Sequence, residues 1–141
     1  MAQLNLGSSG KRHINESTFK TTVQHQKEIN GNTLAQLNKF GVGDDSRLGL
    51  EFFFYTNNQD KARNLALELK KLNYNIVTVD KSAGNPKLWV VTGWTTPIQM
   101  DVNSVTMWSK YMCRIGFQND CDFDGWGTTP DQGDFEVEDP E

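Results

Sequence analysis

Four aspartates close to the end of the chain have the spacing of a calcium-binding loop. In an EF-hand loop, carboxylates at positions 1, 3, 5 and 12 converge on the cation, and a glycine at position 6 permits the sharp turn. The residues at these positions are Asp120, Asp122, Asp124, Asp131 and the glycine Gly125. The run from 120 to 131 is therefore a candidate calcium site.

The same run also departs from an EF-hand loop. Asp131 replaces the usual bidentate glutamate, and Pro130 fits poorly within the helix that leaves such a loop. We favour a glycine-rich turn in which Gly125 and Gly127 adopt conformations closed to other residues and Trp126 packs against the fold. Trp126 can alternatively serve as a binding anchor, because an aromatic side chain on a tight turn loses little entropy when it docks. We predict no metal and no other cofactor.

A family resemblance covers part of this run and much of the chain before it. The signature near the end of the RraB family, regulators of ribonuclease E activity, resembles the five residues Asp124, Gly125, Trp126, Gly127 and Thr128. Upstream, Gly-Asp-Asp-Ser-Arg at 43–47 leads into Leu-Glu-Phe-Phe-Phe-Tyr at 50–55, which is similar to the family's entry to its first strand. Leu-Asn-Tyr-Asn-Ile-Val at 72–77 resembles a further family motif, with Asn73 where a glycine is common. The resemblance extends over roughly residues 19 to 129.

The resemblance implies a bacterial, cytoplasmic regulator that works by binding a protein and has no catalytic activity. Its partner is expected to be a ribonuclease E-type enzyme, and its effect is to lower RNA turnover. The signature residues 124–128 are then either a protein-binding site or a structural turn.

The length of 141 residues suits one domain with a hydrophobic core. The first ten residues lack the basic and apolar stretches of a signal peptide, and no apolar run approaches the about 20 residues of a membrane span. We expect a soluble cytoplasmic protein with a flexible leader at 1–12, one domain at 13–130 and an acidic tail at 131–141.

Charge is distributed unevenly along the chain. Nine of the 18 carboxylates lie between Asp120 and Glu141, and residues 1–119 carry 14 bases against 9 acids, a balance of +5. A mildly basic body with an acidic tail can steer association with a charged partner, or the tail can simply keep the protein soluble.

Few side chains suit catalysis. His13 and His25 lie in the polar N-terminal region, and no motif places a base beside a nucleophile. Cys113 and Cys121 lack the spacing of a zinc site or a disulfide framework and are predicted to be buried or idle free thiols. We therefore predict that the protein is not an enzyme.

Apolar periodicity predicts an α+β fold. Residues 16–30 are expected to form a polar helix ended by Gly31, and Thr33 to cap a short second helix with Leu34, Leu37 and Phe40 on its buried edge. The remaining elements are expected as a strand over 48–55, a helix over 60–72, strands over 74–79 and 88–94, a helix from Asp101 or Asn103 to Gly116, and a short strand near 121–123. This order is β-α-β-β-α-β, a ferredoxin-like sandwich with additional N-terminal helices.

The predicted sheet leaves an RNA-binding interpretation open. Phe53, Tyr55 and Trp89, together with the basic body, are typical of the sheet aromatics on which ferredoxin-like RNA binders stack bases. However, the chain has no RNP-type box, and the N-terminal helices carry enough apolar residues to cover this face. We favour a covered face, so RNA is the less expected partner.

Overall fold

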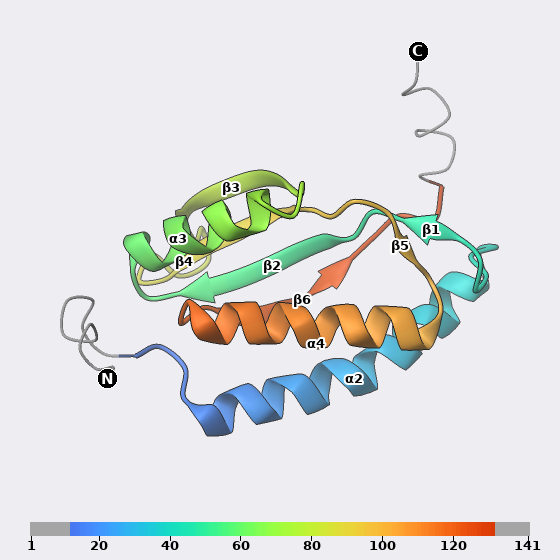
Figure 1. Cartoon of the computed structure of the whole chain (residues 1–141), viewed down its shortest axis with the longest axis horizontal. Helices are drawn as coiled ribbons and strands as arrows, with labels where there is room; N and C mark the ends of the chain where they lie inside the picture. Colours follow the sequence, from blue (N-terminus) through green and yellow to red (C-terminus); the bar gives the residue numbers. More distant parts are fainter. Residues whose placement is uncertain (1–11, 132–141) are drawn as a thin grey trace, which may run out of the picture.

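The computed structural model describes residues 12–131 and is an α+β fold with antiparallel sheets, as predicted; this part of the chain forms three helices (Figure 1). The predicted leader and acidic tail lie almost entirely outside the described residues. The elements in chain order are α2 (Glu16–Asn38), β1 (Arg47–Leu48), β2 (Glu51–Thr56), α3 (Gln59–Lys70), β3 (Asn75–Lys81), β4 (Trp89–Trp94), β5 (Ile98–Gln99), α4 (Val102–Gln118) and β6 (Asp122–Gly127). Within this part of the chain, no helix is long and apolar enough to cross a bilayer.

The main sheet has the strand order β3-β4-β2-β6, and each neighbouring pair is antiparallel. The short strands β1 and β5 form a separate two-stranded ladder. Because β2 lies inside the sheet, both its edges are paired, and its aromatic run Phe52, Phe53 and Phe54 occupies the middle of the fold.

The two faces of β2 differ in burial, as the period of two in a strand requires. Phe52 and Phe54 are fully buried, and α3 and α4 contribute Leu65, Leu69 and Met112 to the same core. On the opposite face, Phe53 and Tyr55 are half-buried. We call the face that carries Phe53 and Tyr55 the outer face of the sheet.

The N-terminal helical region differs from the prediction. A single helix, α2, runs from Glu16 to Asn38, so Gly31 does not end a helix and Thr33 does not begin one. A glycine inside a helix costs only about 1 kcal/mol relative to alanine, and packing of α2 along α4 outweighs this cost. Gly41, at φ +91°, ends the helix instead.

Helix α2 lies alongside α4 and reaches the edge strand β6, and the expectation that it covers the aromatic face of the sheet is wrong (Figure 1). The contact with α4 includes the rings of Phe19 and Phe117, whose centroids are 4.8 Å apart. Phe40, predicted on a buried edge, is 70% exposed.

Helix α4 begins where predicted, with Asp101 as N-cap accepting a hydrogen bond from the backbone N–H of Ser104. It does not end at Gly116. A side chain at Gly116 would clash with the carbonyl oxygen of Cys121, which lies 2.6 Å from an ideal Cβ position, so this glycine permits close packing inside the helix. The helix ends in a Schellman motif: Asp120 adopts φ +60°, and the backbone N–H of Cys121 donates to the carbonyl of Gly116.

Candidate functional site

The signature residues 124–127 lie within strand β6 and do not form the predicted turn after the last strand. The predicted short strand near 121–123 is therefore longer at its C-terminal end. Register shifts between Phe53 and Phe54, where Phe54 pairs with Phe123 and Phe53 pairs with Gly125. Asp124 is the extra residue of this β-bulge, and its side chain is exposed.

Gly125 holds the backbone conformation that the bulge requires. Its φ of +122° lies in a region that side-chain-bearing residues rarely adopt. Gly127 has no positive φ, so the expectation that both glycines are conformationally special holds for Gly125 only. The amide of the buried Gln26 in α2 lies beside Gly125, within 3.5 Å of an ideal Cβ position.

Replacement of Gly125 by alanine should destabilise the fold by about 1 kcal/mol or more, because alanine cannot adopt this φ without strain. Gly127→Ala is the matched control, since an added Cβ there meets no atom within 4 Å. Chemical denaturation of both variants checks this prediction, and equal stability of the two would contradict it.

Trp126 joins the last strand to two helices. Its indole Nε1–H donates to Asn30 Oδ1 of α2 at 2.8 Å, and Asn30 Nδ2 donates to Ser109 Oγ of α4 at 2.9 Å. Asn30 is fully buried, so these bonds satisfy polar groups that water does not reach. The indole also packs edge-on against Trp108, with centroids 6.4 Å apart. Thr128 follows the strand and donates its hydroxyl to the carbonyl of Gly49 at 2.8 Å.

The four aspartates of the calcium pattern do not converge. Residues 122–127 are extended in β6, whereas an EF-hand site needs a loop that folds around the cation. Asp120 turns inward to other partners, Asp122 accepts a hydrogen bond from Thr22 Oγ1, and Asp131 is exposed beyond the strand. Among residues 12–131, no group of three or more His, Cys, Asp or Glu side chains has a metal-binding arrangement.

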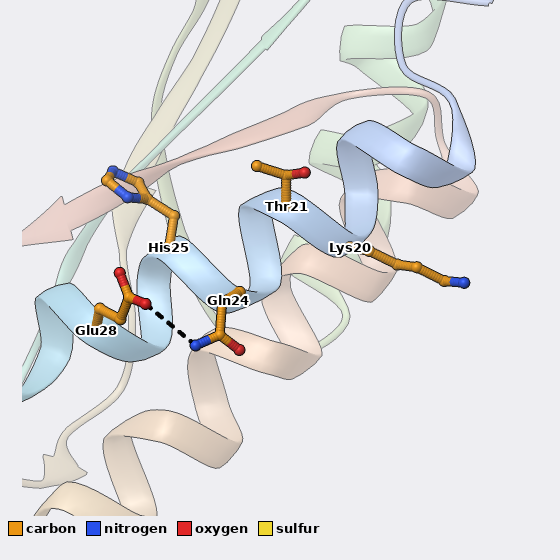
Figure 2. A pocket seen from close by; sticks show the side chains of 5 residues that line it. All are labelled: Lys20, Thr21, Gln24, His25 and Glu28. Carbon is orange, nitrogen blue, oxygen red and sulfur yellow. Dashed lines mark hydrogen bonds between the residues drawn. The ribbon is translucent and has the colours of Figure 1, made fainter.

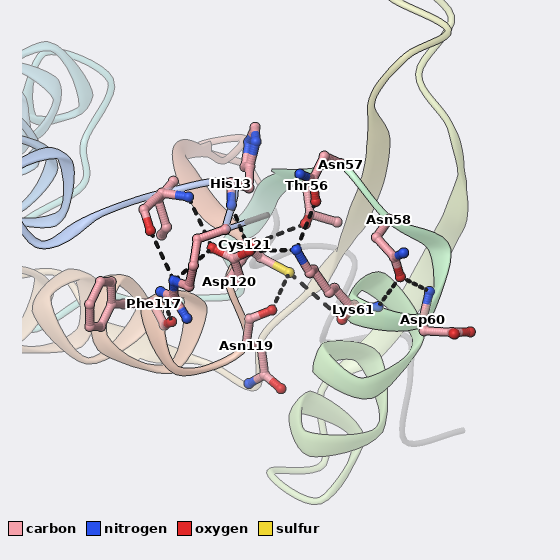
Figure 3. Close-up of polar contacts among 12 residues, drawn as sticks. His13, Thr56, Asn57, Asn58, Asp60, Lys61, Phe117, Asn119, Asp120 and Cys121 are labelled. Atoms are coloured by element: carbon pink, nitrogen blue, oxygen red, sulfur yellow. Dashed lines mark hydrogen bonds and ion pairs between the residues drawn. The ribbon is translucent and has the colours of Figure 1, made fainter. Parts of the chain in front are cut away.

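Asp120 instead forms the centre of a buried polar cluster (Figure 3). Its carboxylate accepts hydrogen bonds from Lys61 Nζ at 2.6 Å and from the backbone N–H groups of His13 at 2.6 Å and Ile14 at 2.9 Å. Arg12 Nε lies 3.3 Å from the same carboxylate. The cluster ties α3 and the N-terminal segment to the turn between α4 and β6.

Two opposing effects set the pKa of Asp120. Burial alone raises the pKa of this carboxyl, but the hydrogen bonds from Lys61, Ile14 and His13 and the charge of Arg12 together hold it below its ordinary value. The carboxylate therefore stays ionised, and the cluster remains an ion pair at neutral pH. Arg12, which the predicted boundary assigns to the leader, is part of this cluster and also lies over the Phe117 ring.

The three aromatics proposed to share a sheet face are divided between two faces. Phe53 and Tyr55 lie on the outer face, but Trp89 pairs with the buried Thr56 and packs on the core side. Trp94, which pairs with Glu51, is the tryptophan on the outer face. The predicted grouping of Phe53, Tyr55 and Trp89 is therefore wrong for Trp89.

Both cysteines are buried free thiols, as predicted. Burial raises the pKa of Cys113 and of Cys121 to about 12. Each thiol is therefore protonated at neutral pH and is a poor nucleophile.

His25 lies on the exposed surface of α2, and His13 lies in the segment before this helix, where its backbone N–H donates to Asp120. His25 is on an open hollow of this helix, together with Lys20, Thr21, Gln24 and Glu28 (Figure 2). Within the hollow, Gln24 donates a hydrogen bond to Glu28 at 3.2 Å. All five side chains come from one exposed helix face, a wet setting that does little to activate a base.

Comparison with known proteins places this chain in a family. A search of curated proteins found no match. The model of the family described as "RraB: Regulator of ribonuclease activity B" matches residues 27–128, which include strands β1 to β6, helices α3 and α4, and the signature. The chain belongs to the RraB family of regulators of ribonuclease activity.

Proposed function

We propose that this protein is a non-catalytic regulator that docks on a ribonuclease E-type enzyme in the cytoplasm and lowers RNA turnover. The observation that carries the proposal is the family match, which spans residues 27–128 and therefore most of the described fold. The strand order β3-β4-β2-β6 and the antiparallel pairing also support assignment of the sheet to the ferredoxin-like class.

A binding role fits the chemistry of the described side chains. The thiols of Cys113 and Cys121 are buried and protonated, and His25 lies on an open helix surface. Asp120, whose carboxylate accepts three hydrogen bonds, is committed to an internal ion pair. These groups stabilise the fold or face water, so binding explains this arrangement better than catalysis does.

Within the signature, we propose a mainly structural role. Trp126 and Thr128 bond to Asn30 and to the backbone of Gly49, and Gly125 holds the bulge of β6. These contacts fasten the edge strand to α2 and to the segment before β2, and so hold the sheet in the shape that a partner recognises.

Capture from cells tests the proposal. The tagged protein should retain a ribonuclease both before and after the extract is treated with an RNA-degrading enzyme, and added protein should slow RNA cleavage by the captured ribonuclease. The protein alone should not cleave RNA. Retention of RNA without any nuclease, lost on RNA digestion, would instead support the RNA-binding alternative.

A further inference from the structure

The outer face of the sheet combines aromatic side chains with one sign of charge. Register places Phe53 opposite Thr92, Tyr55 opposite Val90, and Glu51 opposite Trp94. Trp94 is therefore the diagonal neighbour of Phe53 on the adjacent strand, and Tyr55 lies two residues further along the same strand as Phe53. Both spacings are about 7 Å, which large side chains can bridge. The register therefore places all three aromatic side chains on one face of the two central strands.

This surface is on the side of the sheet away from the core. Phe52 and Phe54 point to the core shared with α3 and α4, and α2 packs along α4 and at the edge strand β6. Phe53, Tyr55 and Trp94 are half-buried, the degree of burial expected when neighbouring strand residues shield one another.

Every charged side chain that the register places on this face is acidic. Glu51 lies on β2, Asp80 pairs with Val90 at the β3 side, and Asp122 pairs with Tyr55 at the β6 side. Among the strand positions of this face within residues 12–131, there is no lysine or arginine. Lys81 is on the opposite face, where its ammonium lies 6.0 Å from the centroid of the Trp89 ring.

Aromatic rings bordered by carboxylates suit one chemical group in particular. A guanidinium is planar and stacks on aromatic faces, and it also pairs with a carboxylate through two parallel hydrogen bonds. A nucleic acid can stack on the same rings, but its phosphates would be repelled by Glu51, Asp80 and Asp122. The charge of this face therefore favours a cationic protein segment over RNA.

We infer that the outer face of the sheet, through Phe53, Tyr55 and Trp94 with Glu51 and Asp80, binds an arginine-containing segment of a protein partner. The inference rests on the proposed function in naming that partner as the regulated ribonuclease. Asp122 contributes charge from the edge strand β6, although its carboxylate also accepts a hydrogen bond from Thr22 of α2.

Two other occupants fit less well. The tail of this chain carries five acids and no base in residues 132–141, so its charge has the wrong sign. A second copy could present the exposed bases Lys110 and Arg114 of α4. That contact would join unlike surfaces and would extend into chains of copies unless the rotation closed a ring.

A peptide titration tests the inference on the full-length protein. The probes are a fluorescent peptide of alternating arginine and glycine, the same peptide with lysine in place of arginine, and a single-stranded uridine oligonucleotide. Fluorescence anisotropy should show binding of the arginine peptide, about tenfold weaker binding of the lysine peptide, and no binding of the oligonucleotide at the same concentrations.

Variants then locate the site. Trp94→Thr and the double variant Glu51→Lys with Asp80→Lys should each weaken binding of the arginine peptide by about tenfold or more. Met107→Ala is the matched control, because this side chain is 73% exposed on α4, and its binding should equal that of the wild type. The charge variant keeps the test valid if Trp94→Thr fails to fold, which circular dichroism would show.

Several results would overturn the inference. These are equal binding of both peptides, preference for the oligonucleotide, loss of the peptide site in Met107→Ala but not in the outer-face variants, and a concentration-dependent dimer that the charge variant abolishes.

Ribonuclease capture separates this inference from the proposed function. Full capture by the charge variant refutes the outer face as the docking site and leaves the regulator role intact, whereas peptide binding without ribonuclease capture refutes the regulator role alone.

Discussion

Replacement of Asp120 by alanine is expected to lower the free energy of unfolding by about 3 to 5 kcal/mol, because it leaves a buried ammonium without its carboxylate. The Lys61 side chain is 8% exposed, and its Nζ lies 2.6 Å from Asp120 Oδ2. The substitution also removes the acceptor for the backbone N–H groups of His13 and Ile14. Urea denaturation at pH 7, followed by tryptophan fluorescence, measures the change.

Glu68→Ala provides the comparison for this result. Glu68 is an exposed acid on the same helix as Lys61, and its loss should change the free energy of unfolding by no more than about 0.5 kcal/mol. If Asp120→Ala and Glu68→Ala unfold at the same urea concentration, the buried ion pair does not hold the N-terminal segment and α3 to the rest of the fold.

The stabilisation by Asp120 should also depend on pH. The carboxyl has an ordinary pKa of 3.8, and in the folded protein its pKa is lower. The contribution is therefore fully present above about pH 5 and is lost as the pH falls below 3.8 through the folded pKa. The difference in stability between the wild type and Asp120→Asn should shrink over this window. Burial raises the pKa of Asp122, but this residue is present in both proteins, so its contribution cancels from the difference.

Trp126→Ala should destabilise the fold by about 3 kcal/mol, near the lower end for aromatic truncations because the indole is only partly buried. The substitution removes the edge-on packing against Trp108 and the donor to Asn30 Oδ1. Asn30 is fully buried, so its carbonyl oxygen would lose a partner that water cannot replace without rearrangement. Thermal and urea unfolding of the variant measure the loss.

Trp126→Phe separates the two contributions. It keeps most of the ring contact but removes the indole N–H. It should therefore cost about 1 to 3 kcal/mol, the penalty for leaving the buried oxygen of Asn30 without a donor. If Trp126→Ala leaves the melting temperature unchanged and yet abolishes ribonuclease capture, the tryptophan is a docking residue and the proposed structural role of the signature fails.

The elements with strong periodicity could be predicted from the sequence. Leu50, Phe52 and Phe54 alternate with polar or half-buried positions, and all three are fully buried. Asn58 and Asp101 are side-chain caps at the starts of α3 and α4, because their short polar side chains accept from backbone N–H groups of the first turn. Such signals are local, so each can be recognised within a few residues.

Helix continuity was harder to predict because it depends on a distant partner. Gly31 has a low helix propensity, but the contacts between α2 and α4 decide that the helix continues through it. In the same way, Gly116 was predicted to end α4. The residue that ends it is Asp120, an aspartate in the left-handed conformation where glycine is more common.

The candidate site depended on contacts that sequence spacing does not contain. Lys61 is 59 positions before Asp120, and Asn30 is 96 positions before Trp126. The assignment of Trp89 was wrong because alternation within β4 shows which residues share a face, but only the register with β2 shows which face that is. The spacing of the aspartates resembles a metal loop, but Asp120 lies before the strand and Asp124 is the extra residue of its bulge, so these side chains do not converge.

The contacts of the Asp120 carboxylate limit how far this protein can be shortened at its N-terminal end. The span that identifies the family begins at residue 27, in the middle of α2. A fragment trimmed to residues 27–128 would lack Arg12, His13 and Ile14, which supply three of the groups around Asp120, and Phe19, which packs on Phe117. Lys61 would then face a carboxylate newly opened to water. The span that the family model matches is thus shorter than the span that encloses this ion pair. A fragment cut to the matched residues would expose the ion pair to water.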